Sequence, residues 1–203
     1  MMVNRDGALG ILIGAAVGTL FLVPAHGSAQ DSLSASCADV DFTSLEDLTR
    51  CAGQGLVEAQ FLLGLKYANG GGVGEDKAEA AGWYRMAAEQ GDHRAQYSLG
   101  LMYANGEGVQ EDQAEAARLY GLAAEQGHFR AQFRLGLMYA NGEGVPEDLV
   151  FAYLWWDLSA AEGHEIARAR RDIIERRMTR EQIAEAQRLS REWIETHPQD
   201  GGN

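Results

Sequence analysis

The chain has few cysteines and few positive charges. Only two of its 203 residues are cysteine, and 17 lysines and arginines stand against 30 aspartates and glutamates, so the formal net charge is −13. Removing residues 1–29 leaves that charge unchanged, because one arginine and one aspartate are lost together. A surface this acidic repels the phosphate backbone, so we expect no nucleic-acid partner. Two cysteines also exclude a site built from a cysteine cluster.

The chain also lacks the short motifs of familiar enzyme and metal sites. It has no His-Glu-x-x-His and no EF-hand loop. Ser-x-x-Lys, Ser-Asp-Asn and Lys-Thr-Gly, which mark β-lactamase-type serine sites, are absent too. His128 and His164 stand 36 residues apart, each directly after a glycine, which is typical of turn residues of a scaffold. We therefore expect no catalytic residue, no metal site and no cofactor.

One sequence unit occurs three times in the chain. The copies open at Ala59, Ala95 and Ala131, and each reads Ala-Gln-x-x-Leu-Gly-Leu-x-Tyr-Ala-Asn-Gly-x-Gly-Val. The spacing between successive copies is 36 residues, without insertion. A fixed period of this length predicts a stacked repeat protein, in which most recurring residues hold the stack together.

Each unit is predicted to contain two helices joined by a turn. In the first copy, Ala59, Leu63 and Tyr67 share one helical face. The glycines of the Asn-Gly-x-Gly-Val stretch then end this helix. Asp76, followed three residues later by a glutamate, is typical of the N-cap of a second helix, which Gly91 closes.

Each first helix carries a glycine in its interior, at Gly64, Gly100 and Gly136. A glycine inside a helix costs about 1 kcal/mol relative to alanine, so its repetition indicates that a second helix approaches closely. The small pairs Ala87-Ala88 and Ala123-Ala124 are the predicted partners of these glycines.

The period, the Leu-Gly-x-x-Tyr and Gly-x-Gly-Val stretches, Trp83-Tyr84 and Ala-Ala-Glu-Gln-Gly together resemble the Sel1-like repeat family, a relative of the tetratricopeptide repeats. The resemblance is specific, because many positions match in register three times. It implies an all-α fold, a right-handed superhelical solenoid of antiparallel helix pairs. It also implies a protein-interaction or signalling adaptor. Some members carry a β-lactamase label, which keeps an enzyme of the β-lactam or cell-wall hydrolase type as an alternative.

Residues 1–29 are predicted to be a secretory signal peptide. A positive start at Arg5 precedes an apolar or small run, 8–23, and Gly27-Ser28-Ala29 suits cleavage. The run is shorter than the roughly 20 residues that a spanning helix needs. We expect a periplasmic or secreted protein with no stable membrane span after cleavage. An uncleaved segment anchored in the inner membrane is the alternative.

The two cysteines, Cys37 and Cys51, both follow the predicted signal peptide. An even count in an exported protein predicts one structural disulfide. Cys51 lies in a stretch, 44–55, that matches only the second helix of a unit, since Gly55 stands 36 residues before Gly91. We expect this half-unit to cap the N-terminal end of the array, with the disulfide pinning the preceding residues onto it.

The third copy diverges in its second helix, where Phe151, Trp155 and Trp156 replace more polar residues. We predict that they pack against the C-terminal helices; a surface aromatic platform is the alternative.

Thr179 and Gln182 form a capping-box pattern that predicts a last helix. The predicted segments are the signal peptide 1–29, a lead-in 30–43, a solenoid 44–196 composed of a half-repeat cap 44–55, repeats 59–94, 95–130 and 131–166 and a divergent helix pair 167–196, and a flexible tail 197–203.

Partner binding in a solenoid is expected at positions that vary between units. Two positions of the first helix vary in chemistry and lie four residues apart, so they form one stripe. This candidate partner-binding stripe consists of Leu62, Lys66, Ser98, Met102, Arg134 and Met138. By analogy with tetratricopeptide repeats it lines the concave face, where apolar and basic side chains suit a peptide or a helix. The alternative is that these are only tolerant exposed positions.

The recurring Gln60, Gln96 and Gln132 have two interpretations. They could bond the backbone of a bound peptide, or they could hold the stack. Taken together, the sequence predicts a non-catalytic adaptor or regulator of the bacterial cell envelope that binds a protein or peptide. The alternatives are the enzyme named above and a dedicated inhibitor of an exported enzyme.

Overall fold

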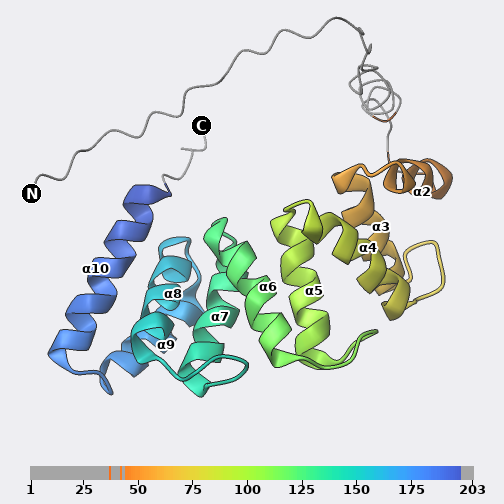
Figure 1. Cartoon of the computed structure of the whole chain (residues 1–203). Helices are drawn as coiled ribbons and strands as arrows, with labels where there is room; N and C mark the ends of the chain where they lie inside the picture. Colours follow the sequence, from red (N-terminus) through yellow and green to blue (C-terminus); the bar gives the residue numbers. More distant parts are fainter. Residues whose placement is uncertain (1–36, 38–41, 43, 198–203) are drawn as a thin grey trace, which may run out of the picture.

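A computed structural model describes residues 37, 42 and 44–197, and these residues form helices and no strand. The helices follow one another as a row of antiparallel neighbours (Figure 1). Their bounds are α2 (Leu45–Gly53), α3 (Val57–Asn69), α4 (Lys77–Glu89), α5 (His93–Asn105), α6 (Gln113–Glu125), α7 (Phe129–Asn141), α8 (Leu149–Ala161), α9 (Glu165–Glu175) and α10 (Arg180–Thr196). The predicted all-α solenoid of helix pairs is confirmed, whereas the predicted signal peptide lies outside the described residues.

Each unit pairs a first helix with a second helix, and that second helix also packs on the first helix of the next unit. The turn between the two helices is set locally. The first helix of the first unit ends at Gly70, whose φ of 69° is left-handed, a conformation that glycine adopts without strain. The Asp76 side chain then accepts a hydrogen bond from the Glu79 backbone N–H at 2.9 Å, so it caps the second helix as predicted.

The interior glycines of the first helices lie against aromatic rings, not against the predicted alanine pairs. A Cβ on Gly64 would lie 2.7 Å from the ring of Tyr84, and one on Gly100 would lie 2.8 Å from the ring of Tyr120. In the third unit Gly136 meets Trp156 at 2.7 Å in the same way. The helices approach closely at these glycines as predicted, but the predicted contact residues were wrong, because each glycine contacts an aromatic ring and not an alanine pair. The alanine pairs pack elsewhere in the same core, and the ring occupies the space that a methyl group would need.

The turn glycines also join consecutive units. Gly108, with a φ of 70°, lies so close to the backbone of Lys77 that a Cβ at this position would collide with it. Gly144 meets the backbone of Gln113 in the same way one unit later. Each turn thus packs directly on the start of the second helix of the preceding unit, which only a residue without a side chain permits.

The two ends of the array are closed differently. Cys37 and Cys51 form the predicted disulfide, and α2 packs on α3 as the half-unit predicts. At the other end α10 packs against α8 and makes few contacts with α9, so it does not complete a regular pair. Its capping box, formed by Thr179 and Gln182, is present as predicted.

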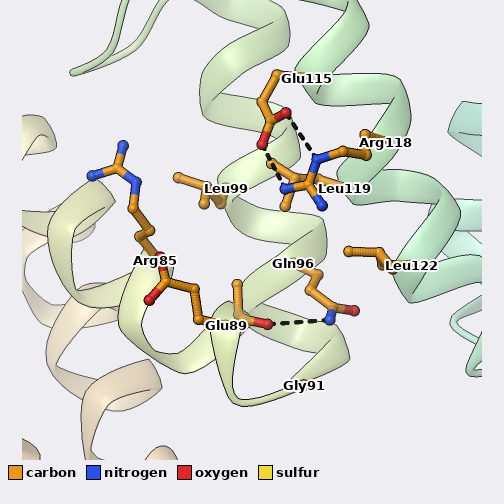
Figure 2. Close-up of a pocket in the computed structure, with 10 residues that line it drawn as sticks. Arg85, Glu89, Gly91, Gln96, Leu99, Glu115, Arg118, Leu119 and Leu122 are labelled. Carbon is orange, nitrogen blue, oxygen red and sulfur yellow. Dashed lines mark hydrogen bonds and ion pairs between the residues drawn. The ribbon is translucent and has the colours of Figure 1, made fainter.

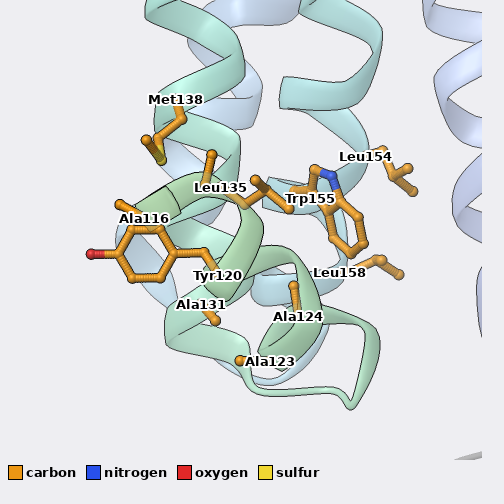
Figure 3. Packing of buried hydrophobic residues seen from close by; sticks show 11 residues of the cluster. Ala116, Tyr120, Ala123, Ala124, Ala131, Leu135, Met138, Leu154, Trp155 and Leu158 are labelled. Carbon is orange, nitrogen blue, oxygen red and sulfur yellow. The ribbon is translucent and has the colours of Figure 1, made fainter. Parts of the chain in front are cut away.

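The aromatic residues of α8 form most of the C-terminal core. Trp155 and Trp156 are 8% and 3% exposed, and Leu189 and Trp193 of α10 pack against the cluster that contains Trp155. Figure 3 shows this ring beside Leu135, with Leu154 and Leu158 toward its other side. The prediction of core is confirmed for both tryptophans. Phe151 differs: it is 39% exposed and stacks on Tyr139 with ring centroids 5.2 Å apart.

Within the part of the chain that the structure describes, no helix combines the length and the apolar character needed to cross a membrane.

The glycine–ring contact predicts opposite effects for two glycine-to-alanine changes. Gly100→Ala should lower the free energy of unfolding by about 1 to 3 kcal/mol, because the added methyl meets the fully packed ring of Tyr120. Gly121→Ala, inside α6 with nothing within 4 Å of the new Cβ, should raise it by up to about 1 kcal/mol through helix propensity alone. Urea unfolding of both variants measures the difference. Equal effects would contradict the packing role of Gly100.

Candidate partner-binding surface

The six residues of the candidate stripe do not form one exposed surface. Met102 and Met138 are only 5% and 4% exposed and belong to the buried clusters of their units. Arg134 is exposed, and Ser98 is half-buried. The expectation that the two methionines face a partner is therefore corrected: they contact the core. Whether the remaining stripe residues bind a partner stays a prediction.

The methionines of the stripe pack with the second helix of the same or the preceding unit. Met102 packs in one cluster with Ala81 and Tyr84 of α4. Met138 packs in the same way with Ala117 and Tyr120 of α6. Lys66, at the equivalent position of the first unit, is half-buried instead of buried.

Two surface grooves, each at a junction between units, lie on the side of the first helices. The groove between the first and second units has a volume of about 160 Å³, and the groove between the third unit and α9 has about 90 Å³. The first is lined by Ala68, Lys77, Tyr84, Ser98, Leu101, Met102 and Glu107. The second is lined by Leu137, Ala140, Asn141, Trp156, Arg170, Ile173, Ile174 and Arg177.

The two grooves are equivalent positions of the repeat. Ala68, Tyr84 and Ser98 of the first groove correspond, 72 residues on, to Ala140, Trp156 and Arg170 of the second. The array therefore presents a hollow at the same repeat position twice, two units apart. A segment lying along the first helices would meet both hollows in turn.

A row of aliphatic side chains runs along the same side. Leu65 is 40% exposed and Ile173 is 58% exposed, and the half-buried Leu101 and Leu137 occupy the corresponding positions between them. We call these four residues the leucine row. Variation between units does not mark these four positions, because their chemistry does not change from one unit to the next. The pattern Leu-Gly-Leu contained the signal, since its two leucines lie two residues apart and cannot face the same side of a helix.

The grooves differ in charge although their shapes are related. At the first, the Lys77 Nζ lies 3.6 Å from a Glu107 carboxylate oxygen, so the rim is neutralised. At the second, Arg170 has no ion pair among the described residues, and Arg177 lies 3.3 Å from a Glu147 oxygen. Burial raises the pKa of Tyr84 at the first groove, so this hydroxyl is neutral at physiological pH.

Comparison with known proteins agrees with this architecture. The model of the Sel1 repeat matches residues 57–92, 93–128 and 129–164, which is more than half of the chain. The chain belongs to the Sel1 repeat family. The matched repeats have the period predicted from the sequence and begin two residues before the predicted boundaries.

Two solved structures illustrate the relationship. A Sel1 repeat protein from Oxalobacter formigenes is 44% identical over 63% of this chain and 96% of that one, with a TM-score of 0.59. The protein c5321, a protective antigen of uropathogenic Escherichia coli with an SLR fold, is 28% identical over 83% of this chain, with a TM-score of 0.59. This chain spans only 44% of c5321. No curated protein shows a significant match. Sel1 repeats generally act as non-catalytic scaffolds that mediate protein–protein interaction.

The recurring glutamines hold the Sel1 repeats together. Gln60, Gln96 and Gln132 are at most 3% exposed, so they are not available to a bound peptide. Each donates to a backbone carbonyl at the end of the preceding second helix, as Gln96 does to the Ala88 oxygen at 3.3 Å. Gln126 in turn donates to the Gln96 side-chain oxygen at 2.8 Å. Of the two interpretations, stack contacts are the correct one.

The third Sel1 repeat lacks the last of these hydrogen bonds. Glu162 stands where the first two repeats have Gln90 and Gln126, and the buried Oε1 of Gln132 has no hydrogen-bond partner. A carboxylate has no N–H to offer this oxygen.

The histidines after the second helices form contacts between repeats. The rings of Tyr97 and His128 stack with centroids 4.7 Å apart, and the His93 ring lies 5.3 Å from that of His128. The Nδ1 of His128 accepts the Ala131 backbone N–H at 3.2 Å, so the ring caps α7. Burial, and after it the neighbouring His93, lowers the pKa of His128 to about 4. These are scaffold roles, as the sequence predicts for His128.

The described residues contain no group of three or more histidine, cysteine, aspartate or glutamate side chains that could hold a metal ion.

Glu162→Gln should restore the missing hydrogen bond. The new amide can donate to Gln132 as Gln126 donates to Gln96, so we expect the free energy of unfolding to rise by about 0.5 to 1.5 kcal/mol. Glu125→Gln removes the same charge from the end of a helix without gaining that bond, and it is the matched control. Urea unfolding of the two variants compares them. If Glu125→Gln stabilises equally, the gain comes from charge alone.

The low pKa of His128 predicts a loss of stability in acid. Between its ordinary value of 6.5 and about 4, the unfolded chain binds a proton at this ring that the folded chain does not. The free energy of unfolding should therefore fall as the pH drops through this window. In His128→Asn, which keeps a cap acceptor, that fall should be shallower. Urea unfolding at a series of pH values measures both slopes, and identical slopes would contradict the assignment.

Proposed function

We propose that this Sel1 repeat protein is a non-catalytic adaptor or regulator that binds a partner protein along the first-helix side of its array. The observation that carries the proposal is the pair of equivalent grooves, 72 residues apart, joined by the leucine row. A single hollow could be a packing accident of one junction. The same hollow at two junctions suits a partner segment that places apolar side chains at regular intervals.

The exposure of the leucine row supports a role in binding. Leu65 and Ile173 are 40% and 58% exposed, although both are large apolar side chains. Leu101 and Leu137, the middle residues of the row, pack partly against the core, so the exposed apolar surface is largest at its two ends. Its burial by a partner would contribute the hydrophobic free energy that drives most protein association.

The proposed location is the bacterial cell envelope. The predicted signal peptide supports export, and a disulfide between Cys37 and Cys51 is compatible with an oxidising compartment. The periplasm is oxidising and is reached by export, so it agrees with both observations. Two rival functions, an enzyme of the β-lactam or cell-wall hydrolase type and a dedicated inhibitor of an exported enzyme, make different predictions for the experiment below.

The test compares charge introduced into the leucine row with charge introduced at an exposed apolar position of a second helix. The full-length protein, tagged at its C-terminus and expressed in its native host, is isolated with the proteins bound to it. Leu65→Glu combined with Ile173→Glu should abolish binding, because it places charge in the leucine row. Met86→Glu, at a second-helix position that is 43% exposed, is the matched control and should bind as the wild type does.

Direct binding of the purified partner to the three proteins, by calorimetry, completes the experiment. A partner that binds the leucine-row variant as well as the wild type would contradict the proposed site. A single very tight partner that is itself an exported enzyme would favour the inhibitor function. β-Lactam hydrolysis by the folded protein, lost on unfolding, would contradict a non-catalytic role.

A further inference from the structure

A larger pocket lies on the other side of the array, between second helices α4 and α6, with α5 as its floor. Its volume is about 370 Å³. Figure 2 shows Arg85 and Arg118 on opposite sides, with Leu99 and Leu119 between them. The remaining lining residues are Ala88, Glu89, Gly91, Gln96, Glu115 and Leu122. We call this hollow the α4–α6 pocket. It is separate from the two grooves and uses none of their residues.

The internal repeat explains why the pocket is there. The same position of the second helix is Trp83 in the first unit, Leu119 in the second and Trp155 in the third. Trp83 packs against the cluster that contains Ala52 and Leu63. Trp155 belongs to the cluster that contains Ala124 and Leu135, the corresponding residues two units later.

Leu119 has the same neighbours but a smaller side chain. It lies in the cluster that contains Ala88 and Leu99, which correspond to the residues around both tryptophans. All three of these residues line the pocket. The second unit thus keeps the walls that surround an indole in its neighbours and lacks the indole. The α4–α6 pocket is the space left by that missing ring.

The pocket also keeps a hydrogen-bond acceptor for an indole N–H. In the first unit the Trp83 Nε1 donates to a Glu79 carboxylate oxygen at 3.0 Å. Glu115 occupies the position of Glu79 and lines the pocket. In the third unit this position is Phe151, and the buried Nε1 of Trp155 has no partner. The acceptor is therefore present in the one unit that has no tryptophan to use it.

We propose that the α4–α6 pocket binds a tryptophan side chain of a partner protein. This second contact goes beyond the first-helix site, because it uses the opposite helices of the array. A polypeptide is the source of the indole because the rim is exposed: Leu122 is 37% exposed and the Arg118 side chain 58%. A free small molecule would stay partly in water there, whereas a partner surface covers the rim around its anchor residue.

The charges at the rim suit an aromatic ring. Arg118 donates to both oxygens of Glu115, at 2.9 and 2.6 Å, and Arg85 donates to the Tyr103 hydroxyl at 3.1 Å. Both arginines line the pocket, so a guanidinium group can turn toward the face of an inserted ring. The described chain already contains such contacts, since Arg94 lies 4.3 Å from the centroid of the Phe61 ring and Arg130 lies 5.5 Å from that of Phe129. A carboxylate has about four lone-pair sites, so Glu115 can also accept an indole N–H.

The probe is N-acetyl-L-tryptophan amide, titrated into the full-length protein and followed by NMR of the leucine methyl groups. N-acetyl-L-alanine amide is the control ligand. We expect the tryptophan probe to shift the methyl signals of Leu99, Leu119 and Leu122 and to give intermolecular NOEs to them. Glu115→Phe, which copies the third unit, should weaken the binding by removing the acceptor.

Leu119→Trp is the decisive variant, because both neighbouring units already carry tryptophan there. It should fill the pocket, raise the melting temperature and abolish the probe's shifts. Shifts that persist in this variant, or that the alanine control reproduces, would overturn the proposal. If the variant does not fold, the NOEs in the wild type decide alone, and their absence overturns the proposal. The first-helix site is untouched by this variant, so its test stands independently.

Discussion

In each of the three repeats an aromatic ring of the second helix lies against a glycine of the first helix, and the rest of the array depends on that contact. The rings of Tyr84, Tyr120 and Trp156 take the space of a missing methyl group, which sets how closely the two helices of a unit approach. The glycine weakens its helix, and packing compensates, because a buried ring contributes more than helix propensity does. Once the pair is fixed at this distance, the turn glycine of one unit can reach the preceding second helix, and the recurring glutamines can span from one unit to the next.

The two sides of the array carry two different kinds of candidate site. Along the first helices the repeated residues leave equivalent hollows, so a partner there could place a side chain in each of them. Along the second helices Leu119 replaces the tryptophan of the first and third units, and a pocket lies at that position. A repeat protein can thus create specificity in two ways, by offering the same site several times or by omitting one residue once. The omission of a residue becomes visible only when the equivalent positions of the repeats are compared with one another.

Much of the fold could be predicted from the sequence, because period, caps and left-handed glycines are local. The 36-residue repeat, the aspartate cap at Asp76 and the disulfide between Cys37 and Cys51 all follow from spacing and residue type. The candidate binding surface was harder to predict, because the exposure of a side chain depends on which neighbouring helices cover it. Met102 and Lys66 share a repeat position, yet Met102 is 5% exposed and Lys66 is half-buried. The partner of Gly100 could not be inferred either, since helical spacing does not say which residue of another helix it meets.

The way α10 turns back also bears on how such a chain could change in length. A solenoid of identical units has no built-in end, and a duplicated unit could in principle be added anywhere. Here α9 has no regular second helix beside it, because α10 packs against α8 instead, and Ile166 and Ile173 of α9 are left 59% and 58% exposed. A unit added after α10 would have no regular helix pair to pack against. A unit added before α2 would have to pack at the end of the array where the disulfide joins Cys37 to Cys51. Duplication can therefore lengthen this array only from within, by inserting a unit between two existing ones, where each new surface meets the neighbour it requires.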